Sequence, residues 1–345
     1  MTDENMTDIS DELPLPESEL VVEQPEISLI DHLTEQVQPV QDEDTMAEAG
    51  RKILLQDFVK MLSKDEGVRV GEDIEFVHDM RVATRRMRSA FRIFEDYYKS
   101  KPVRPFIAQL RELAQTLGAV RDLDVLVDDF SRYQGQLVEQ EAQEALVHVV
   151  EKLEAKRQKA RRKLVAYLDS KSYRRFIKTY SAFLTSPGKS AKGNDEPTPT
   201  PYQVRHVLPV MVYDHLATVR AYDTVLEDAE VNTLHALRIE FKRLRYSIEF
   251  FAPVLGLSIE KFVEEMKQIQ NYLGRLNDVV VAQIRLKNLE ENGDLGDVVH
   301  ESFEHYIQSL ADEQVTLMAG FGDIWTKFNS RTVQRHLSDA LLVLR

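Results

Sequence analysis

The sequence predicts an all-α protein made of two repeated antiparallel helical bundles. Apolar residues recur at helical spacing on both sides of a proline-rich break, and no turn flanked by β-branched runs indicates a β-hairpin. One helical pattern also occurs twice at a nearly constant offset. A repeated helical unit buries its apolar face against its neighbour, so we expect two halves that face each other about a pseudo-twofold axis.

The periodicity and its interruptions divide a domain of residues 46–345. The first repeat spans 46–185 and the second 202–345. Between them, SPGKSAKGNDEPTPTP at 186–201 contains four prolines and two glycines, which is typical of a linker. In chain order we expect helices near 46–64, 73–99, 102–131, 136–169, 171–185, 203–227, 231–253, 259–291, 296–319 and 323–343.

Residues 1–45 differ in composition from the rest of the chain. They contain 14 of the 58 acidic residues, no lysine or arginine and no aromatic side chain. Such a segment buries too little apolar surface to offset the entropy lost on ordering, so we interpret it as an acidic disordered tail. The tail accounts for the whole formal charge of −14, because the 300 residues that follow contain 44 acidic and 44 basic residues.

The composition also excludes several classes of site. The chain has no cysteine, which rules out disulfides, thiolate zinc sites and a cysteine nucleophile. No run approaches the ~18 apolar residues of a bilayer span, and the acidic start is unlike a secretory signal, so we expect a cytoplasmic protein without a membrane partner. The pair His78-Asp79 has no companion histidines at metal-binding spacing, and we expect neither a metal nor another cofactor.

The internal repeat covers two consecutive helices. At an offset of 157 residues, 78–94 (HDMRVATRRMRSAFRIF) aligns with 235–251 (HALRIEFKRLRYSIEFF). At an offset of 156, 106–126 (FIAQLRELAQTLGAVRDLDVL) aligns with 262–282 (FVEEMKQIQNYLGRLNDVVVA). The second alignment pairs Gly118 with Gly274 and Asp122 with Asp278. We expect the glycines, which are unfavourable inside a helix, to let another helix approach closely.

The first helix of the repeat carries a basic stripe beside its apolar face. On a helical wheel His78 lies with Arg81, Arg85, Arg88 and Arg92, and Arg86 leaves the stripe. The second copy repeats the arrangement with His235, Arg238, Lys242 and Arg245.

Exposed helices usually mix charges to gain favourable pairs, whereas residues 80–94 contain five arginines and no acid. The stripes therefore predict an anionic ligand shared by the two halves, against the plain alternative of a solvated helix face. The two histidines are interpreted equally well as phosphate donors or as packed residues. Asp122 and Asp278 either orient the basic side chains by charge-assisted hydrogen bonds or form ordinary interhelical salt bridges.

These motifs resemble the CHAD family, the conserved histidine α-helical domain, over about residues 46–345. The resemblance implies two helical bundles around a basic central channel that binds inorganic polyphosphate, with some members directed to polyphosphate granules. By the same resemblance the binding residues are His78, Arg81, Arg85, Arg86, Arg88, His235, Arg238, Lys242, Arg243 and Arg245. Weaker basic candidates are Arg51, Lys52, Arg92, Arg157, Arg161 and Arg205.

Two departures from the family pattern affect the expected function. Glu249 stands where the first repeat has Arg92. The acidic tail occupies the place where some relatives carry a triphosphate-tunnel enzyme domain, and it lacks the Glu-x-Glu-x-Lys strand of such domains, so that activity does not carry over.

The expected function is therefore the binding of inorganic polyphosphate without catalysis. A nucleic-acid-binding protein is the less favoured alternative, because the stripes lack interleaved aromatic residues on which bases would stack. A phosphoanhydride hydrolase is a further alternative, but the stripes supply almost no carboxylates for metal-assisted attack by water. The sequence makes no prediction about oligomeric state.

Overall fold

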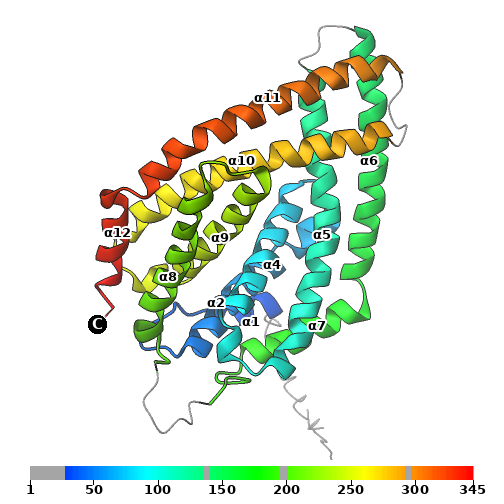
Figure 1. Cartoon of the computed structure of the whole chain (residues 1–345). Helices are drawn as coiled ribbons and strands as arrows, with labels where there is room; N and C mark the ends of the chain where they lie inside the picture. The colour runs from blue at the N-terminus through cyan, green and yellow to red at the C-terminus, as the bar shows by residue number, and fades with distance from the viewer. Residues whose placement is uncertain (1–27, 136–139, 194–200, 292–296, 345) are drawn as a thin grey trace, which may run out of the picture.

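The computed structural model describes residues 28–135, 140–193, 201–291 and 297–344. Within these ranges the chain forms α-helices with short 3-10 turns and no β-strand, which confirms the all-α prediction (Figure 1). The first half contains α1 (Leu29–Glu35), α2 (Met46–Leu62), α3 (Asp65–Val70), α4 (Glu75–Ile93), α5 (Ser100–Gln134), α6 (Gln140–Leu168) and α7 (Lys171–Leu184). The second contains α8 (Val204–Arg220), α9 (Val231–Glu249), α10 (Ile259–Glu291), α11 (Asp297–Phe328) and α12 (Arg331–Leu341).

The two halves follow the same order of packing. In the first half α2 packs on α4, α4 on α5 and α5 on α6. In the second half α8 packs on α9, α9 on α10 and α10 on α11. The corresponding helices α2 and α8 both have 17 residues, and α4 and α9 both have 19. The repeat read from the sequence is thus a repeat of helix order and length, while the pseudo-twofold axis stays a prediction.

Two long helical hairpins enclose the shorter helices. Figure 1 shows α5 and α6 running along one side of the molecule and α10 and α11 crossing to meet their far ends. A separate apolar cluster joins the ends of these hairpins and contains Phe130, Val149, Val279 and Leu310. There the rings of Tyr133 and Tyr306 stack with their centroids 4.3 Å apart. The halves are therefore attached to each other at the hairpin ends.

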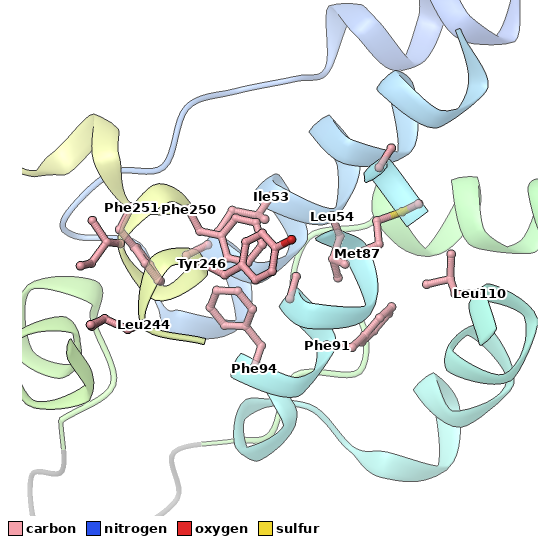
Figure 2. Close-up of a cluster of buried hydrophobic side chains, with 14 of the residues drawn as sticks. Ile53, Leu54, Met87, Phe91, Phe94, Leu110, Leu244, Tyr246, Phe250 and Phe251 are labelled. Carbon is pink, nitrogen blue, oxygen red and sulfur yellow. The ribbon is translucent and has the colours of Figure 1, made fainter. Parts of the chain in front are cut away.

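A second attachment lies at the carboxyl ends of α4 and α9. Phe94 and Phe251, which occupy the same position in the two repeats, are both fully buried, and their ring centroids are 5.8 Å apart. Figure 2 shows them among apolar side chains from α2, α4 and α9. Because each aromatic ring buries a large apolar area, this cluster fixes α4 beside α9.

The structure corrects the predicted tail. Residues 28–45 are ordered, since Ser28 caps α1, and Leu33 and Val40 are buried at 0% and 5% exposure. The amide of Met46 donates to the carbonyl of Tyr202, and that of Val204 to the carbonyl of Asp44, so this stretch pairs with the chain entering α8. Its apolar residues recur at helical spacing, and their burial stabilises the segment despite the acidic residues around them. The remainder of the predicted tail, residues 1–27, lies outside the described residues.

Most helix boundaries agree with the prediction, but the break between the last two helices was predicted in the wrong place. We expected it at 320–322, whereas α11 continues through Gly320 and Gly322 to Phe328. The hydroxyl of Tyr272 donates to the carbonyl of Leu317, which holds α10 against this stretch. The side chain of Ser330 caps α12, and the chain breaks there. Packing against α10 thus overrides the weak helix propensity of glycine.

The predicted role of the two repeated glycines is also wrong. A Cβ atom at Gly274 would have nothing within 4 Å, and one at Gly118 would meet only the Nε of Arg81, at 3.8 Å. Neither glycine therefore permits a close approach of two helix backbones.

Candidate functional site

The basic stripe of α4 follows from the way that this helix is buried. Met80, Met87 and Phe91 face the core and are at most 3% exposed. Arg81 and Arg85 lie next to this apolar face and are half-buried, so their stems pack on protein, and both guanidinium groups are close enough to Lys242 of α9 to lower its pKa. The helix thus presents two cations at its border with the other half.

Lys242 of α9 lies at the centre of the site. The pKa of its ammonium group is lowered to about 8, mainly by burial and in addition by four neighbouring guanidinium groups. Two of these come from its own helix, and two come from α4 of the other half. In decreasing order of influence they belong to Arg238, Arg85, Arg245 and Arg81. We call these four arginines and Lys242 the cation cluster.

The cation cluster has few negative partners. Among the described residues, Glu249 is the only one with a carboxylate within 4 Å of a basic nitrogen of the cluster. Its oxygen lies 3.6 Å from the Nε of Arg245. The buried Nε atoms of Arg85 and Arg238 have no hydrogen-bond partner. Burial lowers the pKa of Arg238, Asp278 raises it and Arg85 lowers it. A cluster of half-buried cations with unused donors is suited to bind an anionic group.

The two histidines have different surroundings. Burial lowers the pKa of His78, and the nearby guanidinium of Arg121 lowers it further. His235 is exposed, and its Nδ1 is joined to Oδ1 of Asn277 by a hydrogen bond of 2.8 Å. His235 and Asn277 line a shallow pocket between α9 and α10 whose other walls are mainly apolar. The electrostatic contact between His78 and Arg85 places His78 beside the cation cluster.

The two repeated aspartates have different roles. An Oδ1 of Asp122 lies 3.3 Å from a guanidinium nitrogen of Arg285, which joins α5 to α10 as an ordinary interhelical salt bridge. Asp278 instead lies near Arg238 and raises its pKa. The orienting role predicted for both therefore has structural support at Asp278 only.

Arg86 is tied to protein groups and lies outside the cation cluster. Its Nε donates to the carboxylate of Asp57 at 3.0 Å, and its Nη1 donates to Glu249 of the other half at 3.3 Å. The guanidinium carbon also lies 4.8 Å from the ring centroid of Phe250. Asp57 is 1% exposed, so Arg86 neutralises a buried charge and joins α4 to α2 and α9. Its repeat counterpart Arg243 donates to Glu240 at 2.7 Å.

The weaker candidates are not brought to the cluster. Arg92 is an exposed side chain whose charge acts on Arg88, a residue outside the cluster. The others donate to protein acceptors elsewhere: Arg51 to Glu48 and the carbonyl of Leu184, Lys52 to Asp44, Arg157 to Asp124, Arg161 to the carbonyls of Arg69 and Val70, and Arg205 to Gln203.

The structure adds a basic residue that the sequence reasoning missed. Arg111 of α5 is exposed, and its charge lowers the pKa of Arg88 across the α4–α5 contact. At the 156-residue offset Arg111 aligns with Lys267, so a basic residue occurs at this position in both repeats. That shared charge was the signal available in the sequence.

Metal sites and membrane spans are two other features that side chains of the described residues could form. No group of three or more histidine, aspartate or glutamate side chains in that part of the chain has a geometry that could hold a metal ion. No described helix is both long and apolar enough to cross a membrane.

The chain is similar to known proteins in sequence and in fold. Two uncharacterized proteins of Mycobacterium tuberculosis, from strains CDC 1551 and H37Rv, are each 29% identical over 232 residues, which are 66% of this chain and 42% of theirs. The chain thus matches less than half the length of these curated relatives.

Two solved structures share the fold. The crystal structure of the CHAD domain from the plant Ricinus communis matches with a TM-score of 0.68 and 23% identity, over 84% of this chain and 93% of that one. PptA from Streptomyces chartreusis matches with a TM-score of 0.59 and 13% identity, over 82% of this chain and 100% of that one. The family model of the CHAD domain matches residues 52–287, from α2 to the far part of α10, and both basic stripes lie inside that match. The chain therefore belongs to the CHAD domain family, whose function is related to polyphosphate.

Proposed function

We propose that this protein binds inorganic polyphosphate at the cation cluster and does so without catalysis. The observation that carries the proposal is Lys242, an ammonium group that two arginines from each half surround. Bringing like charges together is unfavourable in the free protein, and an anion that enters the cluster relieves the repulsion. The family relation to polyphosphate supplies the expected class of anion.

A linear polyanion suits this geometry for two reasons. Guanidinium groups donate pairs of parallel hydrogen bonds to phosphate oxygens, and the unused Nε donors of Arg85 and Arg238 are available for them. Basic side chains also continue from the cluster along α4, where Arg81 and Arg88 are separated by about 10 Å at the rise of an α-helix. A chain of phosphates contacts successive cations along this length, whereas a single phosphate reaches only a few of them.

The proposed contact residues are a subset of those carried over from the family. They are the cation cluster together with Arg88 and His78. Arg86 and Arg243 act in the protein framework through Asp57 and Glu240. Nucleic acid is less favoured because the rings nearest the cluster, those of Tyr246 and Phe250, are only 4% exposed and offer no surface for base stacking.

Titration of alanine variants with polyphosphate tests the site. Replacing Arg81, Arg85, Arg238 or Lys242 by alanine should each weaken binding by about 1–3 kcal/mol, the value of a charge-assisted hydrogen bond. The matched controls Arg162→Ala and Lys178→Ala remove exposed cations on α6 and α7 and should leave the affinity within about twofold. Unchanged affinity in a folded quadruple variant would refute the site. Competition by single-stranded DNA at several salt concentrations separates polyphosphate from nucleic-acid binding, since specific binding of polyphosphate persists in excess DNA.

A further inference from the structure

The two halves of the basic site differ in charge although the repeat suggests that they match. On α4 the stripe continues past the cation cluster, because the exposed Arg88 has cationic neighbours in Arg111, Arg92 and Arg81. Burial lowers the pKa of Arg88, and these three guanidinium groups lower it further, with no carboxylate among the causes. Positive charge therefore extends from α4 to α5 on the first-half side.

The corresponding end of α9 carries an acid. Glu249 occupies the position of Arg92 in the repeat, and its two oxygens are already engaged: Oε1 lies 3.6 Å from Arg245 and Oε2 accepts from Arg86 at 3.3 Å. Arg245 is the repeat counterpart of Arg88. The positive charge of Arg245 is therefore partly neutralised by an acid, whereas Arg88 has further positive charges around it.

The α4–α5 side also has room for a ligand. Arg111 and Arg104 line a pocket between the end of α4 and the beginning of α5, and the exposed acid Glu95 lines it as well. In the described part of the chain, Arg88, Arg92 and Arg111 form no ion pair within 4 Å. These three exposed guanidinium groups are therefore free to contact an anion that leaves the cluster.

We propose that Arg88, Arg92 and Arg111 form an outer subsite, so that a long polyphosphate chain continues from the cation cluster along α4 and α5 and not past the end of α9. The inference rests on the proposed function and adds a direction and a length dependence to it. Tripolyphosphate fills only the cluster, while long-chain polyphosphate also occupies the outer subsite. The gain in affinity with chain length then comes from the first half alone.

The repeat provides a matched pair of variants for the test. Arg111→Ala and Lys267→Ala each remove one exposed cation at equivalent positions of α5 and α10. With long-chain polyphosphate, isothermal titration should show affinity about three- to tenfold lower for Arg111→Ala, the range for a solvent-accessible charged contact. A plot of log affinity against log salt concentration should also be less steep for Arg111→Ala, by the amount expected for the loss of about one phosphate contact. Lys267→Ala should leave the affinity for long chains unchanged, and neither variant should alter that for tripolyphosphate.

The possible outcomes separate this inference from the proposed function. Equal losses in the two variants would show that the ligand extends in both directions and would overturn the inference, as would no loss in either, while leaving the site itself intact. A loss for tripolyphosphate in Arg111→Ala would place Arg111 in the cluster and also overturn it. Failure of the unmodified protein to bind either polyphosphate would overturn the proposed function as well. Circular dichroism before titration shows that each variant is folded.

Discussion

Lys242 is a cation surrounded by cations, which makes it the residue most sensitive to its ligand. In the free protein its pKa is lowered to about 8, so the ammonium group begins to lose its proton only slightly above neutral pH. A bound polyanion favours the protonated form and raises that pKa again. Ligand binding and proton binding at Lys242 therefore reinforce each other.

The affinity for polyphosphate should fall as the pH rises through 8. With a free-state pKa of about 8, Lys242 is mostly charged at pH 7 and mostly neutral at pH 9, so we expect about tenfold weaker binding at pH 9. Titrations at the two pH values measure the difference. Lys242→Arg keeps its charge over this range and should bind equally at both, and an undiminished pH effect in that variant would assign the titration to another group.

Arg86 should matter more for stability than for binding. Arg86→Ala leaves the Asp57 carboxylate, 1% exposed, without its main partner, so we expect a loss of about 3–5 kcal/mol in the free energy of unfolding. Its repeat counterpart provides the control, because Arg243 is 40% exposed and pairs with Glu240 on its own helix. Arg243→Ala should cost less than about 1 kcal/mol.

The pH dependence identifies the mechanism of that loss. Burial raises the pKa of Asp57, and Arg86 opposes the rise. Without Arg86 the pKa rises further above its unfolded value, so the folded variant takes up a proton as the pH falls and regains stability that it lacks when Asp57 is charged. Urea denaturation should thus give a smaller gap between variant and unmodified protein at pH 5 than at pH 8. A gap of the same size at both values would mean that lost packing, not the buried charge, causes the effect.

At the scale of the helices, the two repeated glycines should be open to replacement. Gly118→Ala and Gly274→Ala should each stabilise the protein by about 1 kcal/mol, since alanine is the better helix former and the added methyl group meets at most an ordinary contact. Thermal denaturation measures the change. Gly50→Ala is the contrasting variant, because its Cβ atom would lie 2.9 Å from Phe94 and Tyr98 and should destabilise by about 1–3 kcal/mol. If either Gly118→Ala or Gly274→Ala destabilised the protein, that position would require the space that glycine leaves free.

The sequence predicts helices well where local signals mark their ends. Ser170 caps α7 and begins it at the predicted residue, and α10 has the predicted bounds. Where tertiary contacts decide, the prediction was wrong. A break was predicted at 320–322, yet α10 holds α11 helical through it, and Leu33 is buried within a segment whose acidic composition indicated disorder.

The site was predicted to a similar extent. A helical wheel places Arg81 and Arg85 on one stripe, and the structure brings them to Lys242. The wheel also shows that Arg86 leaves the stripe, but not where it goes, because its partners Asp57 and Glu249 are 29 and 163 residues away in sequence. Long-range partners of this kind depend on how the helices pack, which single-helix periodicity does not contain.

At the scale of the whole molecule, charge is separated. The chain has a formal charge of −14, yet the contact between its halves carries five cations. Residues 46–345 contain equal numbers of acidic and basic residues, so the cluster is a local concentration of positive charge that acts over the short distance set by screening, about 8 Å at physiological salt. Selectivity then favours flexible anions that reach between the halves.

A binding role predicts that the protein releases no phosphate from polyphosphate or nucleoside triphosphates. The cluster consists of protonated donors, which bind phosphate oxygens and do not accept a proton from an attacking water molecule. A phosphate-release assay with Mg²⁺ or Mn²⁺ should therefore remain at the buffer blank. Release above the blank that His78→Ala abolishes would reveal an enzyme.

The contacts on either side of the connection between the repeats have a consequence for how such a protein arises. Before the connection, the amide of Lys192 donates to the carbonyl of Tyr97. After it, Gln203 forms an antiparallel bridge with Thr45. Both flanks are therefore held by the folded body, and the covalent link adds little beyond raising the effective concentration of one half near the other. Two separate polypeptides, each supplying one basic helix and one long hairpin, would make the same contacts. Fusion lets the two halves differ in sequence. Glu249, at the repeat position of Arg92, is a difference that two identical subunits cannot have.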